Sequence, residues 1–412
     1  MRSDLDRLMA DRNLEALFIV GGGHVPNAPR TYLANGINVN GLVVKKRGDV
    51  AIVISHPMEI EEDRHSGLTC LSLQDFGWAE LVQQAEGKRT KAEIALWGRI
   101  LERLAIPPGK IGVYGVGDIH VYLEFMKLVA QAHPDNQFVG EMGTTLFDAA
   151  YATKDETEIA RIRSVAQRTN AVVSAAWNFI GEHRADDEET VIKADGSPLT
   201  IGDFKRFVRR NLLDVDLEDT DMIFAQGRDG GFPHSRGQAD MPLKLGQAIV
   251  FDIFPRELGG GYHHDMTRTW SIGYATDAVQ EVYNSVMEAF DVGVEMTRAG
   301  QPTYRPQEAV LDYFEREGHA TVRTQPGNNE GYTHSLGHGL GLNIHERPSL
   351  HHVLREDTFQ RGNVVTIEPG LYYPSRGFGV RIEDTFYIDD SGQLVDLTTF
   401  HKQLVLPLNG KD

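Results

Sequence analysis

Three histidines lie close together in a glycine-rich stretch, residues 333–346, which reads THSLGHGLGLNIHE. They are His334, His338 and His345, and glycines at alternate positions stand between them. Each glycine is unfavourable inside a helix by about 1 kcal/mol, whereas in a strand it marks the close approach of a ligand or another backbone. The stretch therefore predicts an extended segment that carries imidazole groups past something that needs room.

Four carboxylates accompany apolar runs in the same half of the chain. Asp252 interrupts AIVFDIF, and Glu368 interrupts VVTIEPG. Asp265 follows the first of these acids, and Glu383 follows the second, at similar distances along the chain. A carboxylate in an apolar run is costly unless it is paired or binds a metal, although each acid taken singly could equally face solvent from a half-exposed strand.

Both pairs of acids share one local pattern. An apolar strand with an acid leads into a loop, and the loop ends in a second acid two residues before Thr267 or Thr385. We interpret the pattern as two similar β-hairpins, related by an internal duplication, that each deliver two carboxylates.

Four carboxylates that lie close together repel one another unless positive charge lies between them. Unit charges about 4 Å apart interact by roughly 4 kcal/mol at an effective dielectric of about 20, and two divalent cations would balance four negative charges. Oxygen ligands with one imidazole suit Mn²⁺, Zn²⁺, Co²⁺ or Fe²⁺. A single structural Ca²⁺ is the competing interpretation, and the nearby histidines count against it.

Length and composition favour a soluble protein of two domains. The chain has 412 residues, more than one hydrophobic core usually holds. Its net charge of −18 argues against nucleic acid or an anionic membrane as a partner. A single cysteine, Cys70, excludes an intrachain disulfide and favours a reducing compartment. The first residues resemble neither a secretion signal nor a membrane span, so a cytoplasmic location is expected.

Residues 1–148 predict an α/β domain, because strand-like and helix-like patterns alternate. Strands are expected at 16–20, 41–44, 50–55, 68–73, 111–116 and 137–140, and helices at 3–13, 78–85, 91–104 and 119–132. Two of these strands flank a turn and predict a hairpin. No residue of this domain is a candidate for catalysis.

Residues 153–412 predict a second domain with the candidate chemistry. Helices are expected at 155–180, 201–212, 276–299 and 306–318, and the remainder is rich in strands and loops. The first of these helices begins with acidic residues, which a helix N-terminus favours. The polar residues 182–199 are expected to form a mobile insertion.

Five residues of the second domain occur in the order and local context of a known metal site: Asp252, Asp265, His338, Glu368 and Glu383. Their context strings are FDIF, HDMTRT, HSLGHGLGLNIHE, TIEPGLY and GVRIEDT. This set resembles the dinuclear site of the pita-bread metallopeptidases, which include methionine aminopeptidase, Xaa-Pro aminopeptidase and prolidase. The resemblance implies an α+β pita-bread catalytic domain behind a creatinase-like α/β N-terminal domain.

The resemblance also implies two divalent metal ions, with Mn²⁺ as the first candidate and Zn²⁺, Co²⁺ or Fe²⁺ as alternatives. Asp252 would bind one ion, and His338 with Glu368 would bind the other. Asp265 and Glu383 would bridge the two.

Further residues match the substrate side of such sites. His234 and His345 match histidines that contact the substrate and the tetrahedral intermediate, and His334 matches a third histidine of the proline-specific branch. Arg381 matches an arginine beside the metal centre of that branch. Glu368 is expected to take a proton from the nucleophile and pass it to the leaving nitrogen.

The resemblance implies hydrolysis of the bond between an N-terminal residue and a following proline, by a hydroxide that bridges the metals. The expected substrates are short peptides, and a homodimer is implied. A lyase or another hydrolase on the same fold, or a non-catalytic peptide-binding module, is the alternative. Creatine-hydrolysing members lack the metal ligands, and binding modules have usually lost them. The sequence leaves open whether the enzyme is a dipeptidase or an aminopeptidase, which first residue it prefers and which metal it uses.

Two local features complete the expectations. In an extended segment His345 would face away from His338, so a bend is expected at Gly339 and Gly341. The hairpin loop 253–264 is longer than the resemblance leads us to expect, and it places two histidines directly before Asp265. The longer loop leaves open an altered rim of the substrate site.

Overall fold

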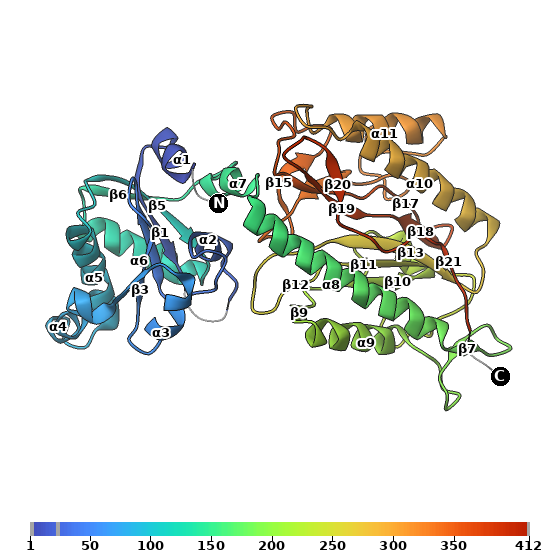
Figure 1. Cartoon of the computed structure of the whole chain (residues 1–412), viewed down its shortest axis with the longest axis horizontal. Helices are drawn as coiled ribbons and strands as arrows, with labels where there is room; N and C mark the ends of the chain where they lie inside the picture. The colour runs from blue at the N-terminus through green and yellow to red at the C-terminus, as the bar shows by residue number, and fades with distance from the viewer. Residues whose placement is uncertain (1–3, 22–24, 410–412) are drawn as a thin grey trace. The chain divides into compact units, whose positions relative to one another are not determined.

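The computed structural model describes residues 4–21 and 25–409, and it divides into two compact units. One unit covers the chain up to Tyr151 together with Gly259–Gly261, and the other covers the remainder from Ala152 onward. Figure 1 shows the two units as ribbons.

The first unit is built on a mixed six-stranded sheet in the order β4-β3-β2-β1-β5-β6. Its strands are β1 (Leu14–Val20), β2 (Leu42–Lys46), β3 (Ile52–Ser55), β4 (Thr69–Ser72), β5 (Gly109–Gly115) and β6 (Asn136–Val139). β2 pairs antiparallel with β1 and β3, while the outer pairs are parallel. The six expected strands and the expected hairpin are therefore confirmed.

Helices flank this sheet; four of them match the predicted positions, and three short ones, α2, α3 and α7, are additions. They are α1 (Leu5–Asp11), α2 (Ala28–Leu33), α3 (Ile60–Asp63), α4 (Trp78–Gln84), α5 (Arg89–Arg103), α6 (Ile119–Ala132) and α7 (Leu146–Tyr151). The first position of the helix expected at 3–13 lies outside the described residues. The short helix α2 was not expected, although its sequence carries a signal: the Asn27 side chain caps it by accepting a hydrogen bond from Arg30 N–H.

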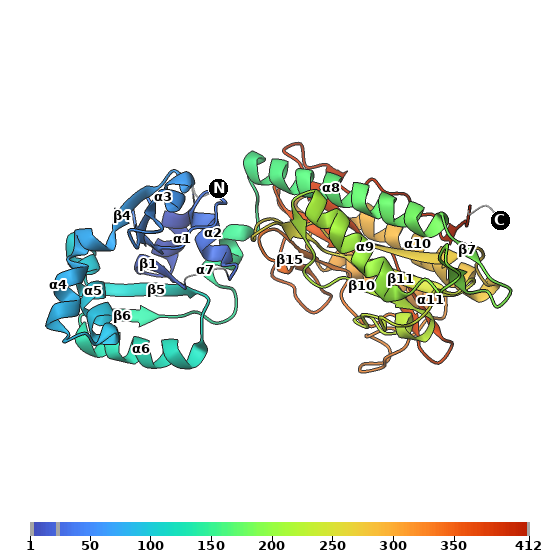
Figure 2. The ribbon, with the colours of Figure 1, turned by 90° about the horizontal axis from the view of Figure 1, so that it is seen from below.

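Four long helices of the second unit agree with the sequence patterns: α8 (Glu156–Gly181), α9 (Ile201–Asp214), α10 (Asp277–Met296) and α11 (Arg305–Arg316). Capping boxes start α8, through Asp155 and Glu158, and α9, through Thr200 and Asp203. α8 packs on α9, and α10 packs on α11, as Figures 1 and 2 show from two directions.

The segment expected to be a mobile insertion is an ordered ribbon. β7 (Arg184–Ala185) pairs with β8 (Val191–Ile192), and Val191 N–H donates to the Leu243 carbonyl at 2.9 Å. The expectation of mobility was wrong because Val191 and Ile192 are buried, which the polar composition around them did not indicate.

Two sheets in the second unit carry the candidate site. One has the order β10-β11-β13-β21, and the other has the order β15-β14-β16-β19-β20. Their strands are β10 (Ile223–Gln226), β11 (Ala248–Ile253), β13 (Met266–Ile272), β21 (Val405–Leu406), β14 (Gly337–Gly339), β15 (Glu346–Leu350), β16 (Val364–Ile367), β19 (Asp384–Ile388) and β20 (Leu394–Asp396). Side chains from α10 and α11 form one apolar core with the second sheet.

The two expected carboxylate hairpins are only partly alike. β11 pairs with β13 and β16 pairs with β19, both antiparallel, as the pattern predicts. The chain between β16 and β19, however, forms its own hairpin, β17 (Gly370–Tyr373) with β18 (Phe378–Arg381). Pro369 follows Glu368 directly and has no N–H for a ladder hydrogen bond, so β16 cannot continue past this point.

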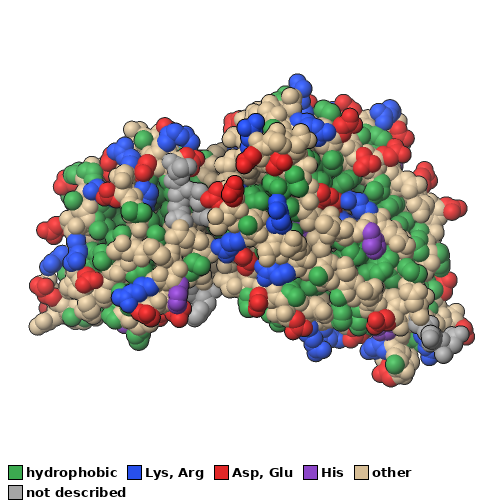
Figure 3. Space-filling model, viewed as in Figure 1, with side chains coloured by type: hydrophobic (Ala, Val, Ile, Leu, Met, Phe, Trp, Pro, Cys, Tyr) green, Lys and Arg blue, Asp and Glu red, His purple; other side chains and the backbone are tan. Residues whose placement is uncertain are grey.

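A short ribbon, β9 (Leu217–Glu218) with β12 (Arg256–Glu257), completes the strands of the second unit. On the face that Figure 3 shows, Lys and Arg side chains are scattered among acidic ones and form no continuous basic surface. Among the described residues, no helix combines the length and the apolar character needed to cross a membrane.

Candidate metal centre

Hydrogen bonds fasten the two carboxylate-bearing strand pairs to each other. Glu383 N–H donates to the Thr267 carbonyl at 3.0 Å, and Thr267 N–H donates back to the Glu383 carbonyl at 3.3 Å. Two residues further along, Arg381 N–H donates to Thr269 Oγ1, and Thr269 Oγ1 donates to the Arg381 carbonyl, both at 2.9 Å. Because these links join β13 to the chain just before β19, Asp265 and Glu383 lie next to each other.

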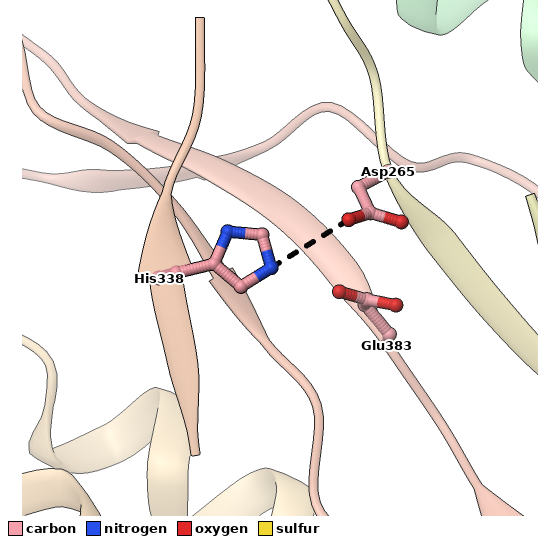
Figure 4. Close-up of side chains that lie close together, drawn as sticks. All are labelled: Asp265, His338 and Glu383. Carbon is pink, nitrogen blue, oxygen red and sulfur yellow. Dashed lines mark ion pairs between the residues drawn. The ribbon is translucent and has the colours of Figure 1, made fainter. Parts of the chain in front are cut away.

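His338 reaches this pair of acids from β14. Its Nε2 lies 3.6 Å from Asp265 Oδ2 and 3.6 Å from Glu368 Oε1. One donor atom each of Asp265, His338 and Glu383 lies within 4.8 Å of the others, and Figure 4 shows the three side chains pointing toward one another.

Two glycines allow β14 to approach its neighbours this closely. A Cβ on Gly337 would stand 2.1 Å from the Thr366 carbonyl oxygen, and one on Gly339 would stand 2.3 Å from the Arg347 carbonyl oxygen. The prediction that another backbone comes close is confirmed. The register of β14 against β15 shifts between His338 and Gly339, where the strand ends. The chain bends from Gly341 to His345, so of the two expected positions Gly341 is confirmed as the bend.

The carboxylates of the site repel one another. Burial, together with repulsion from Glu383 and Asp252, raises the pKa of Asp265 well above its usual range. Burial and the charge of Glu383 likewise raise the pKa of Glu368, and burial and Asp252 raise the pKa of Glu383 to about 8. The protein by itself therefore does not balance the negative charge of this cluster.

The donor set of the cluster fits divalent metal ions. One buried oxygen each of Asp252, Asp265 and Glu383 has no hydrogen-bond partner among the described residues. Buried polar atoms are normally paired, so these oxygens are available as ligands. Burial lowers the pKa of His338 to about 3 and keeps its imidazole neutral, which a metal ligand requires.

Arg381 holds Asp252 in place. Arg381 Nη2 donates to Asp252 Oδ2 at 2.6 Å, and Arg381 Nε donates to Thr267 Oγ1 at 3.1 Å. Its Nη1 donates to the Tyr372 hydroxyl at 2.7 Å and to the Pro233 carbonyl at 3.2 Å. Only 3% of the surface of Arg381 is exposed, so protein atoms surround its guanidinium group.

Tyr372 is a residue of the site that the sequence did not single out. Its hydroxyl lies between Arg381 Nη1 and His334 Nε2, at 2.7 and 2.9 Å. His334 Nδ1 in turn lies 2.7 Å from the Ser335 carbonyl oxygen. Tyr372 follows shortly after Glu368 in the sequence, and this position was the only signal that it could belong to the site. A local sequence pattern does not show which face of β17 is turned toward the carboxylates.

The histidines expected on the substrate side approach the same cluster. The rings of His345 and His338 are 4.4 Å apart and nearly perpendicular. His234 is exposed and follows Pro233, whose carbonyl Arg381 binds. Burial and the nearby His234 lower the pKa of His345, and burial lowers the pKa of His334 to about 3.

The two histidines directly before Asp265 make hydrogen-bond contacts with neighbouring segments of the catalytic unit. His264 is fully buried, and its Nε2 lies 3.1 Å from Thr398 Oγ1. His263 N–H donates to the Gly341 carbonyl at 2.8 Å. Neither belongs to the group of closely spaced potential ligands found among the described residues.

The fold and the site together define a hydrolase of the pita-bread metallopeptidase class. Residues 160–390 match the model of metallopeptidase family M24, which is more than half of the chain. The chain belongs to this family. The expected family, the α/β first domain and the pita-bread catalytic domain are thereby confirmed.

Relatives of the chain include an Xaa-Pro dipeptidase of Pyrococcus furiosus, 37% identical over 240 residues, which cover 58% of this chain and 61% of the relative. An uncharacterized peptidase of Bacillus subtilis, YqhT, is 30% identical over 217 residues, 53% of this chain and 57% of the relative. The matched part thus spans about three fifths of these curated relatives.

Solved structures show the same architecture along nearly the whole chain. An X-Pro aminopeptidase from Thermotoga maritima gives a TM-score of 0.75 at 20% identity and covers 98% of this chain and 100% of its own. The prolidase from Pyrococcus furiosus gives a TM-score of 0.70 at 22% identity and covers 96% of this chain and 99% of its own. At sequence identities of 20% and 22%, these similarities show a shared fold and nothing further.

Proposed function

We propose that this chain is a metal-dependent exopeptidase that hydrolyses the bond between an N-terminal residue and a following proline, as an Xaa-Pro dipeptidase or aminopeptidase. The observation that carries the proposal is the convergence of Asp265, His338 and Glu383, with buried oxygens that lack partners, in a chain of family M24. The similarity to an Xaa-Pro dipeptidase supports the choice of substrate.

Five side chains would hold two divalent metal ions: Asp252, Asp265, His338, Glu368 and Glu383. When bound, such ions supply a water nucleophile that is ionised near neutral pH and an electrophile for the scissile carbonyl. Mn²⁺ is our first candidate, because carboxylate ligands predominate in this set.

Glu368 is the proton carrier in this proposal. Its carboxylate lies at the end of β16, partly exposed, with Oε1 3.6 Å from His338 Nε2. Burial and neighbouring acids raise its pKa, so the carboxyl group can take a proton from the nucleophile and release it to the leaving nitrogen.

His345 is the donor for the oxygen that becomes negative in the transition state. Its ring packs against His338, which places it beside the metal ligands while part of it remains exposed to a substrate. A donor aimed at developing charge contributes more than one that contacts only the ground state. His234, which is exposed, is assigned to the substrate as well.

Arg381 acts in this proposal through Asp252 rather than through the substrate, because its donors already bind protein atoms.

His334 is the remaining candidate for the proline side of the substrate. A peptide nitrogen that belongs to proline carries no hydrogen, so the site must recognise the ring and the carbonyl group. Short peptides with proline at the second position are the proposed substrates, and a homodimer is the proposed assembly.

Hydrolysis assays on metal-stripped protein test this function. An Xaa-Pro dipeptide, an Xaa-Pro tripeptide and the same dipeptide with alanine in place of proline would each be incubated with Mn²⁺, Co²⁺ or Zn²⁺. Cleavage of the dipeptide alone identifies a dipeptidase, and cleavage of the tripeptide as well identifies an aminopeptidase. If no peptide is cleaved with any metal, the proposal is wrong, and a lyase or a binding module takes its place.

A further inference from the structure

A buried lysine–glutamate pair lies behind the loop that carries His345. Lys154 Nζ is 2.8 Å from Glu346 Oε2, and each side chain is 1% exposed. Burial of two charges is unfavourable unless their geometry and further hydrogen bonds compensate for the lost water. The proposed function assigns neither residue a role, so the pair needs a separate explanation.

The His345 loop, residues 340–345, connects β14 to β15 without a helix or strand. Within it, Gly341 N–H donates to the Asn343 carbonyl at 3.0 Å. Glu346 Oε1 accepts a hydrogen bond from Asn343 N–H at 2.9 Å. One oxygen of the Glu346 carboxylate therefore binds the loop, and the other binds Lys154.

The lysine is itself fixed by the framework of the catalytic unit. Lys154 N–H donates to the Gly362 carbonyl at 2.8 Å, two residues before β16 begins. A Cβ on Gly341 would stand 2.6 Å from Glu346 Oε2 and 2.9 Å from Lys154 Cε. The ion pair thus packs directly against the backbone of the His345 loop.

A second contact holds the loop at Gly341, near its start. His263 N–H donates to the Gly341 carbonyl at 2.8 Å, and His263 Nδ1 lies 3.2 Å from the same oxygen. The loop is therefore held by Lys154, Glu346 and His263 in addition to its own backbone hydrogen bond between Gly341 and Asn343.

We propose that Lys154 and Glu346 are positioning residues, whose ion pair holds the His345 loop so that His345 stays against His338. The catalytic consequence rests on the proposed function, because it requires His345 to contact the substrate. The ordering of the loop does not depend on that function.

The test compares Lys154→Met, Glu346→Gln and the double variant with wild type. Lys154→Met leaves the buried carboxylate of Glu346 without its partner, so the loop should move outward. Hydrogen–deuterium exchange of the peptide that contains the loop should become faster, and kcat for an Xaa-Pro dipeptide should fall by about 10- to 100-fold. KM should change much less than kcat.

The double variant removes both charges and keeps an amide oxygen that can accept from Asn343 N–H. Exchange protection of the loop and a large part of kcat should therefore return. If the double variant is no better protected than Lys154→Met, the pair is not what orders the loop.

A His345→Ala background separates positioning from general damage. If Lys154 acts through His345, Lys154→Met should reduce kcat by less than about twofold in that background, because the effects of coupled residues do not add. An equal loss with and without His345 overturns the proposal. Lys45→Met removes a buried lysine that pairs with Asp6 at 2.6 Å in the first unit, and it should leave both the loop and kcat unchanged.

The outcomes also separate this inference from the proposed function. Faster exchange in Lys154→Met in a protein that cleaves no peptide supports the positioning role and contradicts the function. Unchanged exchange with unchanged kcat contradicts the positioning role alone. If Lys154→Met does not fold, Glu346→Gln carries the same comparison, because it leaves the lysine without its partner.

Discussion

Arg381 and Asp252 form a buried ion pair of 2.6 Å that joins the β17–β18 hairpin to the carboxylate-bearing strand β11. The guanidinium comes from β18 and the carboxylate from β11. The contact engages Asp252 Oδ2 and leaves Oδ1 without a partner among the described residues. Arg381 thereby fixes the direction in which one carboxylate faces the proposed metal site.

Arg381→Lys should weaken the site, because one ammonium group cannot reach Asp252, Thr267 and Tyr372 together. Changes in residues that orient ligands typically cost about 10- to 100-fold in metal affinity or activity. Titration of Mn²⁺ into metal-stripped protein and kcat/KM on an Xaa-Pro dipeptide would measure the loss. Arg376→Lys, an exposed change in the same β-hairpin, is the matched control and should behave as wild type.

Glu368→Gln should lower kcat by about 10²- to 10⁴-fold, because the amide cannot carry the proton. The measurement is kcat at saturating metal, with bound metal quantified in the same samples. Glu356→Gln, at a side chain that is 86% exposed, is the control. Activity near that of wild type in Glu368→Gln would contradict the assigned role.

Removal of metal should destabilise the catalytic unit, because the carboxylates then repel one another without compensation. At a free Mn²⁺ concentration 100 times its dissociation constant, binding should raise the free energy of unfolding by about 2.7 kcal/mol. Calorimetry with chelator and with added Mn²⁺ would detect the shift. In Asp265→Asn the shift should shrink, and an undiminished shift would place the metal elsewhere.

Gly337→Ala should reduce stability, since the new methyl group would meet the Thr366 carbonyl at 2.1 Å. Overpacking of this kind costs about 1–3 kcal/mol, or more where backbone must move. Gly140→Ala is the matched control, because no atom lies within 4 Å of the added Cβ. Denaturant unfolding of both variants gives the comparison, and equal stabilities would show that β14 can shift.

His319 should make stability depend on pH. Burial lowers its pKa, and its ring nitrogens lie 2.7 Å from the Tyr373 hydroxyl and 3.1 Å from Ser285 Oγ. The folded state therefore favours the neutral ring, so its contribution is complete above the ordinary histidine pKa of about 6.5 and is lost as pH falls below it.

Denaturant unfolding of wild type and His319→Gln at several pH values would measure this contribution. The stability advantage of wild type should be largest near pH 7.5 and should shrink toward pH 5. The exposed change His120→Gln is the control and should show no such trend. An advantage that grows as the pH falls would contradict the sign.

The sequence by itself determined which residues could form the site and what elements carry them. Asp252 and Glu368 stood out because a charge in an apolar run is costly, and the glycines around His338 stood out because they exclude a helix. The caps and periodic patterns of the long helices are local properties, and a local pattern can be read without knowledge of the fold.

Only the tertiary structure decided which of these residues meet. The pairing of Arg381 with Asp252, the position of Tyr372 beside His334 and the contact of Lys154 with Glu346 join residues that are far apart in the chain or on different strands. Such contacts depend on the register of the sheets and on how the strand pairs pack. Periodicity along one segment carries no information about these distances, because it specifies a face and not the neighbour that covers it.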